Sequence, residues 1–577
     1  MCVARLRSAR GCALPAALLL AALAAVSPAA RPEEPAVWAI TNARIFPVSS
    51  PVVEKGTIVI RNGIIEAVGS SVSIPADARV LDAAGLTVYP GLIDALSDIG
   101  LEEARPETQA AARAPAQPAV PARPGAPAQQ QPAAPPSEES RGLTPYRQAA
   151  ELLSLTNRKI ESARNAGITT TLVSPRTGFF PGQSSVINLT GGDVGRMVVR
   201  TPVAYHITLS QARGFGRGYP SSLMGVFAFV KQTLLDAQRY DAVWAQYRST
   251  PGVPRPEYSR ALEALQPLIQ RRLPVVLYGN TPVEIERALA LADSFKLDVI
   301  LAGCMEAGPI ASELRRRNIP VLLGVRYPEP PARDGDPEFK EELEALRRRV
   351  EAPANAAALA KAGVRFAFVS DDMANPADFL RNVGRAVEAG LDRQAALRAL
   401  TLTPAEILGI ADRFGSIEKN KTANLVLATG DLFANGTRVK YVFVDGERFE
   451  IPETPAERPA GGPGAKPAAA AGALDVSGTW DLVISSPQGP MDVTLTVRQS
   501  GETLTGSLSS MMGESAIYQG TVSGNRISFR IAFEPPGMPS MEVLFTGTVQ
   551  GTQITGTASV ADMGSFDFTG SKRPGDY

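Results

Sequence analysis

Three residues whose side chains are suited to catalysis or metal binding lie in or just after strand-like segments. The single histidine, His206, lies in "VAYHITL". Asp98 comes just after "VYPGLIDAL", and Asp371 lies near the end of "VRFAFVSDD". Imidazoles and carboxylates can transfer protons or bind divalent cations. Cys304 has no second histidine to serve as its base, so we interpret it as a small buried hydrophobe and not as a nucleophile.

These residues also have purely structural interpretations. His206 can be a hydrogen-bonded strand residue, and Asp371 can cap the helix that "SDDMANPADF" would begin. Asp98, Glu102 and Glu103 can form a solvated loop. The choice between these interpretations depends on the elements that position the side chains.

The first 30 residues have the layout of a secretory signal peptide: arginines, then an Ala- and Leu-rich run, then small residues. The run contains Pro15 and is shorter than the ~20 residues that span a bilayer, which argues against a stable membrane anchor. We therefore predict export, either periplasmic or secreted. Cleavage would remove Cys2 and Cys12 and leave Cys304, so no internal disulfide is expected.

Length and charge limit the classes of partner. The 577 residues suffice for about two to four domains. The 58 basic and 58 acidic side chains balance, and no long basic run occurs, which argues against a nucleic-acid partner. A small molecule is the expected ligand or substrate, and a homo-oligomer remains open.

Two segments offer no apolar face that could be buried. Residues 104–141, rich in Ala, Pro and Gln, are interpreted as a disordered insertion within a domain. Residues 452–473 are interpreted as an interdomain linker because different patterns lie on either side.

Alternating strands flank the central part of the chain. Residues 36–88 contain several, with Asn62-Gly63 as a hairpin turn, and residues 412–451 contain more, with Asp445-Gly446 as the turn. Neither group has enough strands for a stable sheet alone. We therefore predict that both groups fold together as one small composite β-sandwich.

Residues 89–411 alternate short apolar runs with helical patterns, which predicts a parallel sheet covered on both faces. The count reaches about eight strands and favours a closed (β/α)8 TIM-type barrel, with an open doubly wound sheet as the alternative. "GFGRGYP" lacks the strand-turn-helix setting of a nucleotide site. The runs are "VYPGLIDAL", "ITTTLVS", "SSVINL", "VAYHITL", "PVVLYG", "LDVILAG", "IPVLLGV" and "VRFAFVSDD".

Residues 474–577 have an all-β pattern, with glycine at most turns, that predicts an antiparallel meander closed into a barrel or sandwich. "GTVSGNRIS" and "GTVQGTQIT" look like copies of one hairpin. A core packed with side chains is the simpler interpretation of this β-domain, and a ligand site is the alternative.

Several phrases resemble the amidohydrolase superfamily, particularly its imidazolonepropionase-like branch. They are "ITNARIFPV", "GTIVIRNGIIEAVG", "VLDAAGLTVYPGLIDAL", "ARNAGITTTLVSP", "VSDD" and "ALRALTLTPAEILGIADRFGSIEKNKTANLVLATG". They occur in the family's order and cover roughly residues 37–450. The resemblance implies a barrel-mouth metal site that activates water to attack an amide or ring C–N bond.

The same resemblance implies which positions would hold that metal. The family's paired histidines fall on Leu96 and Asp98, its fifth-strand histidine on Tyr278, and its sixth-strand histidine on Gly303. Only the aspartate after the eighth strand is matched, by Asp371. One histidine in the whole chain cannot restore four ligands. Tyr278 and Asn280 would then fill the place of the ligands.

Two functional hypotheses follow. One is an exported hydrolase of C–N bonds in cyclic amides or peptides, with Asp371 as proton acceptor. Its residual site of Asp98, His206 and Asp371 would hold a single Zn, Mn or Fe ion. The other is a non-catalytic binding protein that uses the barrel mouth or the C-terminal β-domain, needs no cofactor and has lost the family's chemistry.

Overall fold

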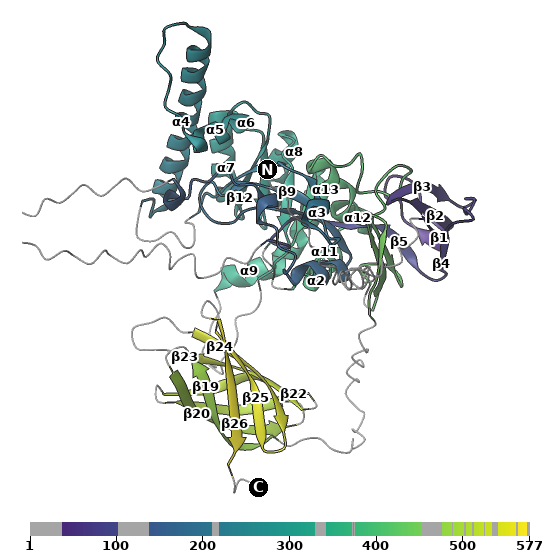
Figure 1. Cartoon of the computed structure of the whole chain (residues 1–577), viewed down its shortest axis with the longest axis vertical. Coiled ribbons are helices and arrows are strands. Elements are labelled where there is room, and N and C mark those ends of the chain that lie inside the picture. Colours follow the sequence, from purple (N-terminus) through teal and green to yellow (C-terminus); the bar gives the residue numbers. More distant parts are fainter. Residues whose placement is uncertain are drawn as a thin grey trace, which may run out of the picture. The chain divides into compact units, whose positions relative to one another are not determined.

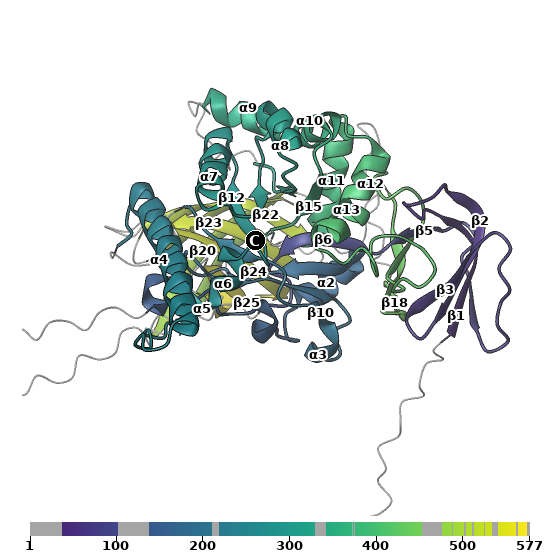
Figure 2. The same cartoon turned by 90° about the horizontal axis from the view of Figure 1, so that it is seen from above.

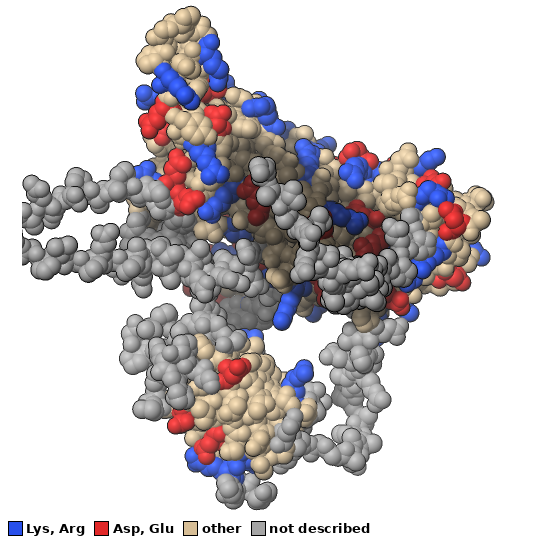
Figure 3. All heavy atoms as spheres, in the orientation of Figure 1, with Lys and Arg blue, Asp and Glu red and all other residues tan. Residues whose placement is uncertain are grey.

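The computed structural model describes 37–101, 138–210, 219–328, 342–371, 373, 375–434, 436–452, 476–486, 489–500, 503–510, 513–523, 525–533, 541–560 and 564–573. These residues fall into two compact units, one within 37–452 and one within 476–573. Among their helices, none has the length and apolar character needed to cross a membrane. On the visible face of the first unit, basic and acidic side chains are interspersed (Figure 3).

Several sequence predictions fall outside the described residues. They are the signal peptide of residues 1–30, most of "GFGRGYP", the linker from residue 453 onward, and residues 104–137 of the insertion. Residues 138–141, the last four of that insertion, are described, and they include a short 3-10 helix, η1 (Glu139–Arg141).

One eight-stranded sheet combines the two flanks of the central domain (Figures 1 and 2). Its order is β18-β17-β16-β5-β1-β2-β3, and β4 pairs with β1. It forms because β16 pairs with β5, which joins the late strands to the early ones. The strands are β1 (Val37–Ile45), β2 (Val53–Arg61), β3 (Ile64–Gly69), β4 (Arg79–Asp82), β5 (Thr87–Pro90), β16 (Leu425–Ala428), β17 (Val439–Val444) and β18 (Glu447–Glu450).

Both predicted hairpin turns occur in this sheet. Asn62 and Gly63 have φ angles of 50° and 77°, and Asp445 and Gly446 have φ angles of 51° and 79°. Positive φ at both central residues defines the tight hairpin turn that Asn-Gly and Asp-Gly favour. The two turns touch, since a Cβ on Gly63 would lie 2.6 Å from the Asp445 carbonyl oxygen.

The central domain is a barrel with eight strand positions. They are β6 (Leu92–Ser97), β7 (Ile168–Val173), the pair β8 (Gly182–Gln183) and β9 (Ser185–Asn188), β11 (Tyr205–Ile207), β12 (Val275–Gly279), β13 (Val299–Gly303), β14 (Val321–Gly324) and β15 (Phe366–Val369). The short strand β10 (Val198–Arg200) pairs with β9 outside this ring. The ring closes between β15 and β6, where the Asp371 N–H donates to the Leu96 carbonyl at 3.0 Å. The fold-class prediction of a TIM-type barrel is confirmed.

The third strand position departs from the all-parallel expectation. β9 pairs antiparallel with β7, and β8 pairs antiparallel with β11. Only residues 174–181 separate β7 from β8, which is too short for the crossover helix that a parallel neighbour requires. The chain therefore turns back directly.

Helices surround the barrel (Figure 2). The predicted helix "TPVEIERALALADSF" forms α7 (Pro282–Phe295), which begins with a capping box between Thr281 and Glu284. The others are η2 (Ala149–Leu152), α2 (Lys159–Asn165), α3 (Val194–Met197), α4 (Leu223–Ser249), α5 (Arg260–Ala264), α6 (Gln266–Ile269), η3 (Gly308–Ile310), α8 (Ala311–Arg316), α9 (Leu343–Glu351), η4 (Ala352–Ala354), α10 (Asn355–Ala362), α11 (Ala377–Glu388), α12 (Arg393–Leu400) and α13 (Leu402–Ile407).

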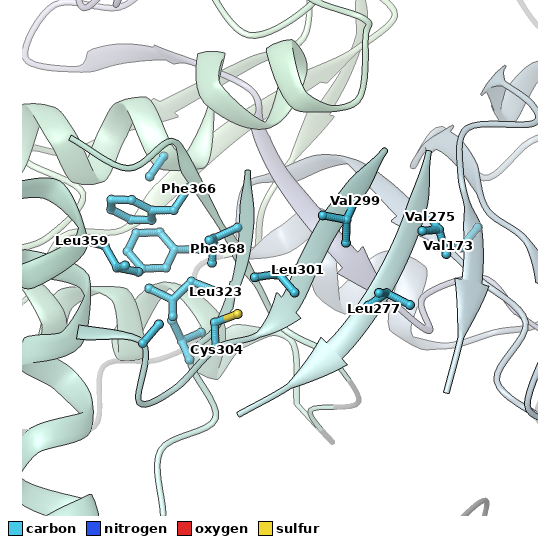
Figure 4. Close-up of a cluster of buried hydrophobic side chains, with 14 of the residues drawn as sticks. Val173, Val275, Leu277, Val299, Leu301, Cys304, Leu323, Leu359, Phe366 and Phe368 are labelled. Carbon is cyan, nitrogen blue, oxygen red and sulfur yellow. The ribbon is translucent and has the colours of Figure 1, made fainter. Parts of the chain in front are cut away.

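Alternate residues of the barrel strands supply two different cores. Val276, Ile300 and Leu322 belong to the inner cluster, which fills the barrel. Val275 and Leu277 belong to the outer cluster, which packs between strands and helices (Figure 4). Both layers are buried, which explains why the strands are continuously apolar.

The second unit is a closed antiparallel barrel of eight strands (Figure 1). They are β19 (Gly478–Ser486), β20 (Gly489–Ser500), β21 (Thr503–Ser510), β22 (Gly513–Ser523), β23 (Arg526–Phe533), β24 (Met541–Gln550), β25 (Gln553–Val560) and β26 (Gly564–Lys572). The two hairpin copies have two-residue turns, closed by Ser523 with Arg526 and by Gln550 with Gln553. Phe529 stacks on Phe545 within a buried apolar cluster.

Candidate functional site

The polar residues singled out from the sequence lie at the carboxyl ends of the barrel strands. Asp98 follows β6 directly, and Asp371 lies two residues beyond β15. The bridge between Ser97 and Asp371 places both carboxylates where the barrel closes. In this fold the carboxyl ends of the strands form the mouth that carries active sites.

Asp371 is paired with Arg176, which the sequence analysis did not single out. Arg176 lies in the loop after β7, and its Nη1 is 2.6 Å from Asp371 Oδ1. The side chains are 32% and 42% exposed. Burial lowers the pKa of Arg176, but electrostatic interactions with Tyr278 and Asp371 and the hydrogen bond to Asp371 raise it by more. The guanidinium therefore stays protonated beside the carboxylate.

Asp98 is paired in the same manner, with Lys159 at the start of α2. Lys159 Nζ is 2.6 Å from Asp98 Oδ2, and the side chains are 22% and 31% exposed. Asn157 holds this part of the chain in place, because its Oδ1 accepts from the Lys159 N–H and its Nδ2 donates to the Leu101 carbonyl. Glu102 and Glu103 lie outside the described residues.

His206 is buried on β11 and contacts Tyr278 on β12. His206 Nδ1 and the Tyr278 hydroxyl are 2.9 Å apart. Burial and the nearby Arg176 charge lower the pKa of His206 to about 3, and burial raises the pKa of Tyr278 to about 12. Both rings are therefore neutral at ordinary pH. Nε2 of His206 has no hydrogen-bond partner among the described residues.

The other two positions implied by the resemblance, Leu96 and Gly303, have no side chain that could bind a metal. Leu96 is 1% exposed and belongs to the inner core. Gly303 has φ +88°, and a Cβ there would lie 2.4 Å from Asn280 Oδ1. A side chain at Gly303 would thus need both an unfavourable backbone conformation and displacement of Asn280.

Cys304 is packed among apolar side chains of the outer core, as the structural interpretation predicted (Figure 4). Burial raises the pKa of its thiol well above the ordinary range. The structure therefore provides no thiolate nucleophile at this position.

Asp94 is a fully buried carboxylate that forms hydrogen bonds with residues next to those of the mouth. The N–H groups of Ser370 and Leu96 donate to its Oδ1 at 3.0 and 3.3 Å, and the Ser370 hydroxyl bonds to its Oδ2. These bonds tie β6 to the turn that carries Asp371. Burial raises the pKa of Asp94 to about 7, against the lowering effect of the hydrogen bonds.

The arrangement does not fit the metal site implied by the resemblance. Asp98 and Asp371 each already hold a protein cation, and His206 is engaged with Tyr278 through Nδ1. Within the described ranges, no three His, Cys, Asp or Glu side chains form a group that could hold a metal ion. The predicted residual site of Asp98, His206 and Asp371 stays a prediction, and in this structure each of its three side chains is engaged by another protein group.

A cavity of about 430 Å³ opens at the same end of the barrel, beside the loops after β12 and β13. Met305, Pro309 and Ala358 give it an apolar part. Charged side chains also line it, and Arg348 and Glu306 form an ion pair of 2.8 Å.

Sequence reasoning missed Arg176, Lys159 and Asp94. Arg176 lies in "VSPRTGFF", directly after a predicted barrel strand, so a search for charged residues in such loops would find it. Lys159 has no comparable sequence pattern, because it begins a helix 61 residues away from Asp98.

Comparisons with known proteins agree with this fold. A family model described as the amidohydrolase family matches residues 317–449. A solved amidohydrolase from Thermotoga maritima is similar with a TM-score of 0.59 and 24% identity, covering 71% of this chain and 99% of that one. The fold is thus that of the amidohydrolases, and the predicted resemblance to the superfamily is confirmed.

Two further matches are more limited. Over 66 residues the chain is 44% identical to a dihydroorotase from Geobacter sulfurreducens, covering 11% of this chain and only 16% of that protein. An adenosine deaminase from Xanthomonas campestris, solved with bound zinc, has a TM-score of 0.38 and 17% identity, covering 72% of this chain and 95% of that one.

Proposed function

We propose that this protein is a metal-independent descendant of the amidohydrolases that binds a small organic molecule at the barrel mouth without hydrolysing it. The observation that carries the proposal is the pair of protein cations held by Asp98 and Asp371. A water-activating metal would need these carboxylates as ligands, and they are already neutralised. The neutral His206 and Tyr278 supply no replacement base, because burial lowers the pKa of His206 to about 3 and raises that of the Tyr278 hydroxyl.

The cavity beside α9 supports a binding role. It combines an apolar part with the Arg348–Glu306 ion pair, which is the composition that positions a small polar organic ligand. We propose small cyclic amides or dipeptides as the first ligand class, because hydrolysis of their C–N bonds is the ancestral chemistry that the fold suggests. Export, suggested by residues 1–30, would place this binding outside the cytoplasm.

A second candidate function is hydrolysis with Asp371 as proton acceptor. The observation that favours it is the exposure of Asp371, which leaves 42% of the side chain accessible at the strand end. This function would require a substrate to displace Arg176 from the carboxylate. Hydrolysis by the wild type that is lost in Asp371→Asn would support it. Equal inactivity of the two proteins over a broad amide panel would exclude it.

The test of the binding proposal is thermal unfolding of the signal-free protein with a panel of cyclic amides and dipeptides, combined with product analysis. We expect stabilisation by some compounds and no turnover. Met305→Trp should fill the cavity and abolish the stabilisation. Met224→Trp is the matched control, because Met224 is 84% exposed on α4. Efficient hydrolysis by pure protein would contradict the proposal.

A further inference from the structure

A second cavity, of about 320 Å³, lies where the eight-stranded sheet meets the end of the barrel opposite the mouth. Asn188, which lines it, pairs with Thr170 near the start of β7, so the cavity lies at the amino ends of the barrel strands. Asn62, Gly63 and Asp445, from the two hairpin turns that touch, line the side that belongs to the sheet. The cavity is therefore separate from the barrel mouth, and both parts of the first unit contribute to it.

Two arginines and one carboxylate line this cavity. Arg196 belongs to α3, Arg413 follows α13, and Asp445 lies in the turn between β17 and β18. Burial raises the pKa of Asp445, and the hydrogen bond from Asn188 and the charges of both arginines lower it. Within the described part of the chain, neither arginine forms an ion pair with Asp445 or with another carboxylate. The two guanidinium groups therefore act on the carboxylate without contacting it.

Hydrogen bonds fix the position of Asp445. Asn188 Nδ2 donates to Asp445 Oδ1 at 2.7 Å, and the Asp445 N–H donates to Asn424 Oδ1 at 2.8 Å. Asn424 Nδ2 also donates to Asn188 Oδ1 at 3.1 Å. Asn188 and Asn424 are 1% and 7% exposed, so this network is shielded from water. A carboxylate that is already oriented loses little conformational freedom when it binds a ligand.

Thr422 adds a hydroxyl to the lining of the cavity. The residue is 4% exposed, and its Oγ1 has no hydrogen-bond partner among the residues that the structure describes. Its backbone N–H is already bonded to the Arg413 carbonyl at 2.9 Å. A buried hydroxyl without a partner is unfavourable, and a polar ligand in the cavity would supply one.

We propose that this cavity is a second ligand site that binds a small α-amino acid as its zwitterion, with the carboxylate held by Arg196 and Arg413 and the ammonium held by Asp445. Guanidinium groups match the planar geometry of a carboxylate. Asp445 would repel an inorganic anion, and the two arginines would repel a simple amine. A volume of about 320 Å³ is at the small end of the range for ligand sites, which suits a single amino acid.

The test is isothermal titration calorimetry of the signal-free protein with L-alanine, and with acetate, ethylamine and phosphate for comparison. We expect saturable binding of L-alanine and binding of acetate and ethylamine that is weaker by about tenfold or more, because each lacks one of the two charged groups. Pyrrolidinone, an uncharged cyclic amide of the class proposed for the mouth, should not compete with L-alanine. The inference and the proposed function can therefore fail separately.

Substitutions assign the binding to this cavity. Arg196→Met and Arg413→Met should each weaken L-alanine binding by about tenfold or more, because each removes a charge-assisted hydrogen bond. Asp445→Asn keeps an oxygen that can accept from Asn188. It should bind L-alanine more weakly than the wild type does and acetate more tightly, since it removes the repulsion of the anion. Arg239→Met, which replaces an exposed arginine on α4, is the matched control and should bind as the wild type does.

Three results would overturn the inference. The first is a folded wild type that shows no saturable binding of L-alanine. The second is binding that all three cavity variants leave unchanged, because the ligand would then lie elsewhere. The third is phosphate that displaces L-alanine and binds more tightly, which would indicate a simple anion site. If Asp445→Asn does not fold, the two arginine variants decide: they should weaken the binding of acetate and leave that of ethylamine undiminished, and the reverse pattern would contradict the proposed orientation.

Discussion

The two ends of the (β/α) barrel carry the same kinds of ion pair in different surroundings. At the mouth, the four side chains of the Lys159–Asp98 and Arg176–Asp371 pairs are 22% to 42% exposed. At the opposite end, Arg271 and Asp298 are 57% and 45% exposed. Exposed pairs contribute little because water already stabilises the separate charges. The two ends therefore differ in the burial of the paired cations, 22% and 32% exposed at the mouth against 57% at the opposite end, and not in the presence of ion pairs.

We expect the largest change in the free energy of unfolding for Asp94→Ala. The change leaves the Ser370 N–H and hydroxyl without their buried acceptor and breaks the tie between β6 and the Asp371 turn. We expect a loss of about 3 kcal/mol or more in the free energy of unfolding. Asp298→Ala at the other end is the control, with an expected loss of about 0.5 kcal/mol. Urea denaturation measures the loss in unfolding free energy of both variants, and equal losses would contradict the expected difference between the two ends of the barrel.

The protonation of Asp94 gives a pH dependence of stability opposite in sign to that of an ion pair that lowers a carboxyl pKa. Its pKa rises from about 3.8 to about 7 on folding, so the folded state binds more protons between these values. The stability contributed by Asp94 is therefore fully present below about pH 4 and is lost as pH rises to about 7. The unfolding free energy of the wild type should fall relative to Asp94→Asn over this range. A difference that is independent of pH would contradict the assignment.

Arg176→Met tests the mouth pair directly. We expect a loss of about 1–2 kcal/mol in the free energy of unfolding, because Asp371 keeps its charge in a partly buried place. Arg271→Met should cost about 0.5 kcal/mol or less. Chemical denaturation of both variants at low and high salt would show whether the mouth pair is also less screened, as its lower exposure predicts.

The smallest effect concerns Cys304, which lies at the mouth end but packs in the outer core. Its buried thiol, with a raised pKa, should not react with a thiol-specific disulfide reagent in the native protein. We expect the thiol to react only after unfolding in urea, and the reaction can be monitored by spectrophotometry. Fast labelling of the native chain would show that this part of the mouth opens.

Local patterns predicted the elements but not all of their directions. Asn62-Gly63 and Asp445-Gly446 indicated their hairpins because both residues of such a turn need positive φ. The apolar runs indicated strands buried on both faces. The antiparallel third strand at residues 182–188 was not predicted, because it depends on the length of the preceding loop and not on the apolar pattern itself.

The candidate site was predicted in part. Asp98 and Asp371 were placed at the mouth through the resemblance, and Cys304 was correctly interpreted as a core residue. The cations that pair with these two carboxylates, Arg176 and Lys159, were not predicted. Arg176 is 195 residues from Asp371 in the chain, and Lys159 is 61 residues from Asp98, so no local spacing connects them.

The sequence by itself determined that one histidine cannot supply a multi-histidine metal centre, and its period and turn residues determined the strands and helices of a barrel. These properties are local or compositional, so they can be counted along the chain. Only the tertiary structure decided which cation each mouth carboxylate holds, how deeply Asp94 is buried and which strand runs backward. Those features depend on barrel closure, which brings distant residues within 2.6 Å and partly shields them from water.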